Sequence, residues 1–109
     1  MTPALAWLVL VIGGLFEVGF TTCLRFVDGF RNIPWTLGFL GSVGMSMGLL
    51  ELASRTIPMG TAYAVWTGIG ALGTVLVGII WFGEAAGMVR ILLMLLLVGS
   101  IAGLRLTAP

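Results

Sequence analysis

The sequence contains no histidine, no lysine and only one cysteine, and it has few charged residues of either sign. Without histidine, the chain lacks Ser/His/Asp and Cys/His catalytic pairs and the commonest protein ligand for metal ions. A lone Cys23 excludes a disulfide within the chain and a cysteine-rich metal site. No other nucleophile and base form a visible pair, so we expect no enzymatic activity, no metal and no cofactor.

Charge is also too scarce for a soluble domain. Only 8% of the 109 residues are charged and 60% are hydrophobic, whereas about 25% of the residues in a soluble domain carry charge. The mean hydropathy is +1.20, and the net charge of +1 arises from five arginines and four acids without a basic patch. These values argue against a nucleic-acid-binding protein and place most of the chain in lipid.

Long apolar segments alternate with three short polar breaks. Because a spanning helix needs about 20 apolar residues, the sequence predicts one all-α membrane domain over 1–109 with four transmembrane helices. We expect these helices at about 4–24, 34–54, 61–82 and 88–104. The N-terminus lacks the positive region and cleavage site of a signal peptide, so we expect the first helix to be retained.

The arginines give the chain almost no preferred orientation. Arg55 and Arg105 lie on one side of the predicted bundle, whereas Arg25, Arg31 and Arg90 lie on the other. Two positive charges against three leave the positive-inside rule nearly without bias. We expect insertion in both orientations, or one orientation set by a partner or by residues at the membrane edge.

Four helices make a bundle too thin to enclose a shielded pathway together with its walls. Many transporters place their site near the membrane midplane between two inverted repeats, and no internal repeat is evident in this sequence. Two copies, or one copy and a related chain, would supply the missing half. The sequence therefore predicts an oligomer, for which an antiparallel arrangement is one solution.

Glu17 interrupts the apolar stretch GGLFEVGF. Ionisable residues inside a membrane are rare and face a bundle interior or a watery cavity. Gly13 and Gly14 precede Glu17 by one turn on the same helical face and leave space there, whereas Phe20 offers an aromatic surface. Burial favours the protonated form of a carboxyl group, which suits the exchange of a proton for a cation. The structural alternative is a glutamate that hydrogen-bonds two helices together.

A second cluster lies in the predicted helix 61–82, where Tyr63 and Trp66 stand three residues apart on one face. An aromatic pair can wall a cation site, and the tyrosine hydroxyl can hydrogen-bond a neighbouring carboxylate. The alternative is an aromatic belt at the membrane edge, because both residues lie near the start of the helix. The glycines nearby favour the binding site.

Those glycines lie in GIGALG, which matches the dinucleotide-binding pattern GxGxxG. We reject that match, because the pattern requires a preceding strand within a βαβ unit and none surrounds it. In a membrane helix, Gly68 and Gly70 instead favour a bend or close packing. A bend would let the helix alternate between two shapes.

Two polar features lie in the predicted helix 34–54. Ser42 and Ser46 stand four residues apart, and such serines usually bond to their own helix or lie in a packing seam. The alternative is that Ser46 orients the deep carboxylate. Glu51 precedes Arg55 by four residues near the membrane edge, a spacing that predicts a surface ion pair.

The predicted helix 88–104 has no acid and ends with GSIAG. Gly99 and Gly103 form a GxxxG pair, which favours close helix association in membranes. We therefore interpret this helix as a dimer-packing element. Cys23 is interpreted as an inert small apolar residue.

Together these features resemble the small multidrug resistance family, four-helix exporters of the bacterial inner membrane, over essentially the whole chain. The resemblance rests on the chain length, on Glu17 and on the segment IPMGTAYAVWTGIGALGT at 57–74. This segment is particularly similar to the guanidinium exporter subgroup. The multidrug subgroup typically has serine and valine where Thr67 and Ile69 stand.

The resemblance implies an antiparallel dimer that exports small cations, guanidinium above all, in exchange for protons by alternating access. Glu17 of each subunit would bind either protons or the substrate in one shared site. The positions that match the lining of that site are Tyr63, Trp66 and Ser46. The positions that match the hinge of the third helix are Gly68 and Gly70.

Three positions depart from the subgroup: Phe20 replaces the usual tryptophan, Arg25 replaces the usual lysine, and Glu51 is atypical. Phe20 lacks an indole N–H donor and enlarges the site. This leaves open larger guanidines, quaternary ammonium ions and a heterodimer with a paralogue. Three hypotheses remain: an exporter of guanidinium-like cations, a broader exporter of hydrophobic cations, and a non-transporting subunit that assembles with a partner.

Overall fold

The computed structural model of the chain describes residues 1–107. They form the helices α1 (Pro3–Leu24), α2 (Ile33–Ser54), α3 (Met59–Trp81) and α4 (Met88–Thr107), and residues 1–107 contain no strand. The expected all-α class with four helices is confirmed.

Two helices extend by more than one residue beyond the bounds expected from the sequence. α3 begins at Met59, directly after an N-cap at Pro58, and α4 continues to Thr107. Pro58 has a φ angle of −52° and a ψ angle of 136°, so its backbone is not helical and it ends the preceding loop. Residues 105–107 contain neither glycine nor proline, so no helix-breaking residue interrupts α4 there.

Local sequence explains where the first two helices begin. The Thr2 hydroxyl accepts a hydrogen bond from the Leu5 amide at 3.2 Å, and the Asn32 side chain accepts one from the Trp35 amide at 3.5 Å. A proline stands in the first turn of each helix. Because the first amides of a helix have no helical partner, a polar cap and a proline both suit this position.

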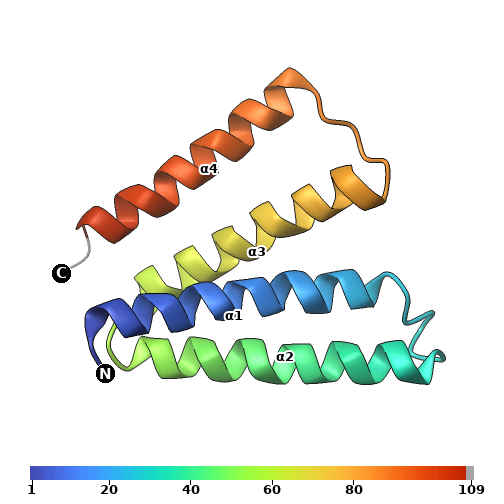
Figure 1. The fold of residues 1–109 in the computed structure, drawn as a ribbon, viewed down its shortest axis with the longest axis horizontal. Coiled ribbons are helices and arrows are strands. Elements are labelled where there is room, and N and C mark those ends of the chain that lie inside the picture. Colours follow the sequence, from blue (N-terminus) through green and yellow to red (C-terminus); the bar gives the residue numbers. More distant parts are fainter. Residues whose placement is uncertain (108–109) are drawn as a thin grey trace.

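The turn between α1 and α2 is left-handed. Asp28, Gly29 and Phe30 have φ angles of 50°, 64° and 67°. This backbone reverses the chain within a short segment, so that α2 returns antiparallel beside α1 (Figure 1).

Across the molecule the helices lie in the order α2, α1, α3, α4, so α4 stands at the outer edge (Figure 1). α1 packs against α2 and α3, whereas α4 packs against α3. The N-terminus and the α2–α3 loop lie at one end of the bundle, and the α1–α2 and α3–α4 loops lie at the other. α1 and α3 therefore run in the same direction.

The buried core lies toward the end of the bundle that holds the N-terminus. Its members are Ala6, Trp7, Leu10, Leu50, Ala53, Ile57, Ala62, Val65 and Trp66. The three alanines are fully buried. Small residues at these positions allow α1, α2 and α3 to approach closely, which is how helices associate in lipid.

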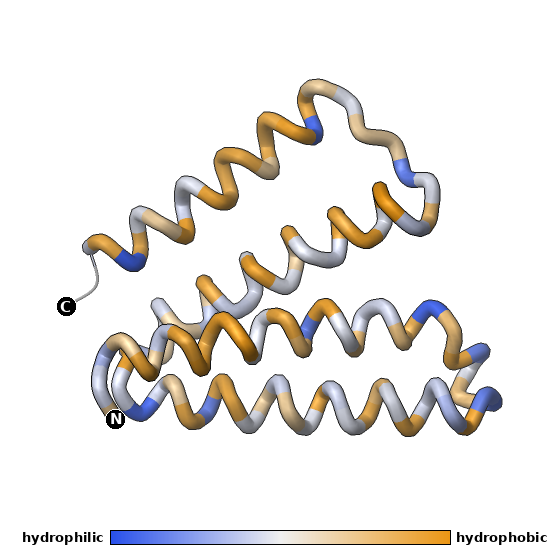
Figure 2. The backbone as a smooth tube through the Cα atoms, viewed as in Figure 1, coloured by the Kyte–Doolittle hydropathy of each residue, from blue (hydrophilic) through white to orange (hydrophobic). Residues whose placement is uncertain are grey.

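Apolar residues recur along all four helices (Figure 2), and many of the large ones are exposed. Each of the four helices is long and apolar enough to cross a membrane. Exposed apolar surface on this scale is stable in lipid and not in water. The chain is therefore a multi-pass membrane protein.

Candidate functional site

Glycines bring α1 and α3 into close contact along one line. A Cβ atom added at Gly14 would lie 2.7 Å from Ile69, and one added at Gly73 would overlap Val18. Both distances are too short for real side chains, so each glycine is needed for this approach. We term this line the α1–α3 seam; its residues are Gly14, Glu17, Val18 and Thr21 of α1 and Ile69, Gly70, Gly73 and Thr74 of α3.

Glu17 lies within the seam, half-buried, and its side chain rests on the backbone of α3. The carboxyl group contacts Gly70 so closely that an added Cβ atom would overlap it. Gly70 is itself buried. The carboxyl group therefore occupies the space that a side chain at position 70 would fill.

The carboxyl group of Glu17 has no countercharge within residues 1–107. The ion pairs among these residues are Glu51–Arg55 and Glu84–Arg90. In the same part of the chain, the buried Oε2 atom of Glu17 has no hydrogen-bond partner. A buried carboxyl oxygen without a partner costs free energy. This group is therefore suited to binding a proton or a cation that comes from outside the chain.

A buried hydrogen-bond chain joins α3, α2 and α1 close to Glu17. Trp66 Nε1 donates to Ser46 Oγ at 2.9 Å, and Ser46 Oγ donates to the Gly13 carbonyl oxygen at 2.8 Å. Ser46 is fully buried. Within residues 1–107, no hydrogen bond joins Ser46 to Glu17, so the role of Ser46 at the carboxylate stays a prediction.

The two aromatic residues expected to wall the site differ in exposure. The rings of Tyr63 and Trp66 have their centroids 5.7 Å apart. Trp66 is 4% exposed, whereas Tyr63 is 56% exposed. The tyrosine thus faces out of the single chain, and a contact between its hydroxyl and a carboxylate stays a prediction.

Phe20 follows Glu17 by one turn and packs against α2. Its ring meets that of Phe39 edge-on, with centroids 5.9 Å apart. The phenyl ring offers no N–H group to a ligand. Its contact with a substrate stays a prediction.

The two glycines expected to act as a hinge face different helices. Gly70 receives the carboxyl group of Glu17, whereas Gly68 lies against Ile101 of α4, which would be 3.0 Å from an added Cβ atom. α3 continues as a helix through both positions. Close packing, one of the two alternatives for these glycines, is therefore observed, and bending stays a prediction.

Gly99 and Gly103 lie on an open face of α4. Nothing lies within 4 Å of a Cβ atom added at either position. This face is free to approach another helix closely, and dimer packing through it stays a prediction.

Sequence reasoning missed a hydroxyl pair that lies beyond Glu17 in the seam. Thr21 Oγ1 and Thr74 Oγ1 are 2.7 Å apart. Thr21 follows Glu17 by four residues, and Thr74 follows Gly70 by four. Because residues four apart share a helix face, this equal spacing was a signal. It becomes informative only when α1 and α3 are known to run side by side.

Comparison with known proteins covers nearly the whole chain. Residues 5–97 match the family model described as Small Multidrug Resistance protein. The chain belongs to the small multidrug resistance family. This confirms the resemblance noted from the sequence and identifies the chain as a membrane transporter rather than an enzyme.

Bacterial relatives in this family match over almost their full length. A guanidinium exporter of Proteus vulgaris is 39% identical over 104 residues, which cover 95% of this chain and 100% of that protein. A guanidinium exporter of Salmonella typhimurium strain LT2 is 41% identical over 95% of this chain and 99% of its own length. One of Yersinia pseudotuberculosis is 43% identical over 95% and 100% of the two chains.

Proposed function

We propose that this member of the small multidrug resistance family exports guanidinium or substituted guanidinium ions in exchange for protons. The observation that carries the proposal is the Glu17 carboxyl group, which lies against Gly70 with a buried oxygen that has no partner within residues 1–107. A carboxylate can accept two parallel hydrogen bonds from a planar guanidinium fork. Relatives 39% and 41% identical are named guanidinium exporters, which supports the same substrate.

One carboxyl group serves both ions in this proposal. When protonated, Glu17 is neutral and suits the apolar seam, and when ionised it requires a cation. A cation therefore displaces the proton, and a returning proton displaces the cation. Exposure of the site to each side of the membrane in turn converts this competition into antiport.

The proposed functional unit is an antiparallel dimer with one site built around two copies of Glu17. The exposed Tyr63 ring beside the buried Trp66 supports a site completed by a second chain. The open face at Gly99 and Gly103 supports contact between two copies of α4. A paralogous chain would fit the same surfaces, so a heterodimer is the second arrangement.

The proposed location is the bacterial inner membrane, with the chain inserted in both orientations. Arginines are almost equally divided between the two ends of the bundle, two against three, so the positive-inside rule gives little bias. Insertion both ways would supply the two halves of an antiparallel dimer from one chain.

Phe20 favours a second candidate function, a broader exporter of quaternary ammonium and other hydrophobic cations. Its ring packs on Phe39 and offers apolar surface without a hydrogen-bond donor. Such a surface suits alkyl or aromatic substituents better than a bare, strongly hydrated cation.

The test is to reconstitute the protein alone in proteoliposomes and to record currents when guanidinium is added. We expect a current that vanishes in Glu17→Gln, because glutamine fills the same space but cannot exchange a proton for a cation. Glu51→Gln is the matched control, since Glu51 is 60% exposed and pairs with Arg55.

The outcome separates the candidates. Currents with tetraalkylammonium ions and none with guanidinium would favour the broader exporter. A folded protein that gives neither a current nor a pH change inside the liposomes with either class of cation, alone or with a paralogue, would contradict both and favour a non-transporting subunit.

A further inference from the structure

A polar pocket lies next to the Glu17 site, toward the end of the bundle that holds the α1–α2 and α3–α4 loops. Its volume is about 360 Å³, and its lining includes Thr21, Arg25, Thr74, Gly78, Phe82 and Glu84. We term it the loop-end pocket. The Thr21–Thr74 hydroxyl pair belongs both to this pocket and to the seam, so it separates the pocket from Glu17.

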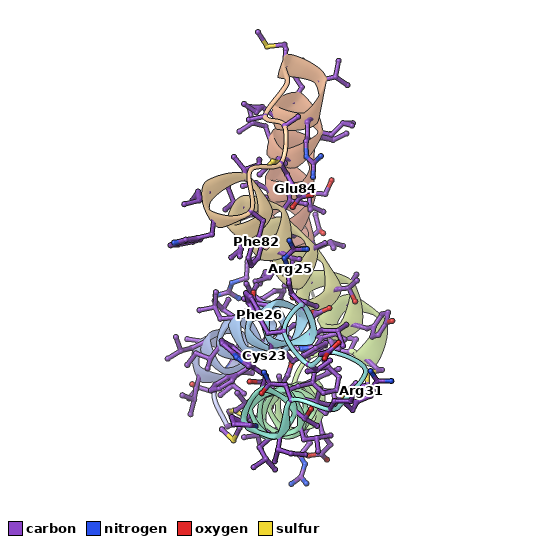
Figure 3. All side chains as sticks on the ribbon, turned by 90° about the vertical axis from the view of Figure 1, so that its right-hand side faces the viewer. Cys23, Arg25, Phe26, Arg31, Phe82 and Glu84 are labelled. Carbon is purple, nitrogen blue, oxygen red and sulfur yellow. The ribbon has the colours of Figure 1, made fainter. Side chains whose placement is uncertain are left out.

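A guanidinium group already lines this pocket. Arg25 directly follows α1, and its Cζ atom lies 4.7 Å from the centre of the Phe82 ring. Figure 3 looks onto this end of the bundle, where Arg25 lies beside Phe82 at the end of α3. No ion pair within residues 1–107 includes Arg25. The side chain is therefore held by a cation–π contact rather than by a carboxylate.

The same pocket contains a carboxylate that is fixed to the end of α3. The Glu84 amide donates to the Gly78 carbonyl oxygen at 3.0 Å, and the Glu84 carboxyl group rests on Gly78. Gly83 permits this return of the chain with a φ angle of 68°. One contact of 3.3 Å joins Glu84 Oε1 to Arg90 Nη2, and Oε2 is the oxygen nearest to Gly78.

The pocket is thus lined by an aromatic ring, hydroxyl groups and a carboxylate, together with the planar guanidinium of Arg25. These groups would also recognise a free guanidinium ion. The aromatic ring would stack on the face of the ion, and the hydroxyl groups and the carboxylate would accept hydrogen bonds from its N–H groups. The charged groups at the pocket are Arg25, Glu84 and Arg90, so a second cation is disfavoured while Arg25 is in place. Arg25 is exposed, and its long side chain can leave the ring for solvent.

We propose that the loop-end pocket is an outer binding site for guanidinium-like cations, and that Arg25 is its tethered competitor, which the incoming cation displaces. The proposal rests on the proposed function for the identity of the cation. The Thr21–Thr74 pair belongs to both the pocket and the seam, so it lies between a cation bound in the outer site and Glu17.

Binding is tested in the Glu17→Gln protein, where the inner site no longer pairs with a cation. The Nε–H resonance of Arg25 is followed by NMR in lipid bicelles with isotope-labelled arginine, and it is assigned with Arg25→Lys. Guanidinium chloride replaces sodium chloride at constant ionic strength. We expect a saturable shift of this resonance, and Glu84→Gln should weaken the apparent affinity on the order of two- to fivefold.

The exposed Arg55 at the opposite end of the bundle provides the reference resonance. No saturable shift of Arg25, or a shift no larger than that of Arg55, would overturn the outer site. This result does not depend on transport, so it stands even if the proposed function fails.

Transport gives a second test in which the two variants act with opposite sign. Arg25→Gln removes the competitor and should lower the half-saturating guanidinium concentration on the order of two- to fivefold, whereas Glu84→Gln should raise it by a similar factor. Arg55→Gln and Glu51→Gln remove the same two kinds of charge at the other end of the bundle and should leave this concentration unchanged. Shifts of the same sign in the two pocket variants would overturn the proposal.

Discussion

The α1–α3 seam and α4 belong to one short chain but are packed in opposite ways. In the seam, glycines let side chains rest directly on the backbone of the neighbouring helix. None of the residues Met88–Thr107 of α4 is buried, and within residues 1–107 this helix packs against α3. Close packing is therefore concentrated around Glu17, whereas the outermost helix keeps its surface open.

The physics of lipid explains why this difference matters. Helices in a membrane gain little from apolar burial, because lipid tails are as apolar as leucine, so small residues and close contact decide which helices associate. The seam uses its glycines within the chain. Gly99 and Gly103 of α4 make no close contact with another helix within residues 1–107, and they are available to a second chain.

The largest expected effect comes from filling the seam at Glu17. Gly70→Ala should lower guanidinium transport on the order of a hundredfold, because the added Cβ atom displaces the carboxyl group from its place. The carboxyl group ends a flexible side chain, so the variant should still fold. Currents and circular dichroism measure the two effects. Gly44→Ala, where the added atom meets nothing within 4 Å, is the control, and normal transport by Gly70→Ala would separate the seam from function.

The next largest effect is expected on the open face of α4. Gly99→Leu combined with Gly103→Leu should leave the helical content unchanged but weaken self-association on the order of tenfold, because close approach between helices is lost. Energy transfer between labelled chains, measured as lipid dilutes them, reports the association. Gly44→Leu combined with Gly48→Leu adds the same volume at the same four-residue spacing to open positions on α2. Equal association in both proteins would rule out this face of α4 as the dimer contact.

A smaller effect is expected where three helices meet. Ser46→Ala should lower the free energy of unfolding by about 1 kcal/mol, because the indole N–H of Trp66 loses its buried acceptor. Adding Trp66→Phe should cost less than the sum of the two single changes, since the two residues share one interaction. Unfolding in mixed micelles measures both, with Ser42→Ala as the control. Strict additivity would show that this hydrogen bond contributes nothing.

The smallest effect is expected far from the seam. Glu51→Gln should change the free energy of unfolding by less than about 0.5 kcal/mol and leave transport unaltered, because its ion pair with Arg55 is exposed to solvent. The same unfolding and current measurements apply. A large loss would place Glu51 in a contact that the single chain does not contain.

Local signals in the sequence were enough to predict several of these features. The four helices follow from the length of the apolar segments, and Glu17 stands out because carboxylates are rare in such segments. The Glu51–Arg55 pair, predicted from its four-residue spacing, is confirmed at 2.9 Å. Each of these signals lies within one helix.

Contacts between residues of different helices could not be predicted from the sequence. The sequence left two interpretations of Ser46 open, a packing contact between helices and a partner of the deep carboxylate. The structure shows the packing contact: Ser46 accepts a hydrogen bond from Trp66 and donates one to the Gly13 carbonyl oxygen. The sequence analysis predicted no role for the Glu84 carboxylate, because its place beside Arg25 and Phe82 depends on how the α3–α4 loop returns over α3.

The sequence by itself determined the medium, the number of helices and the presence of one acid deep within the first of them. Hydropathy and helical period set these properties along a single segment. Only the tertiary structure decided that Gly70 receives Glu17 while Gly68 receives Ile101. The physical reason is that periodicity assigns a residue to a face of its helix, whereas the partner of that face depends on how whole helices cross and pack.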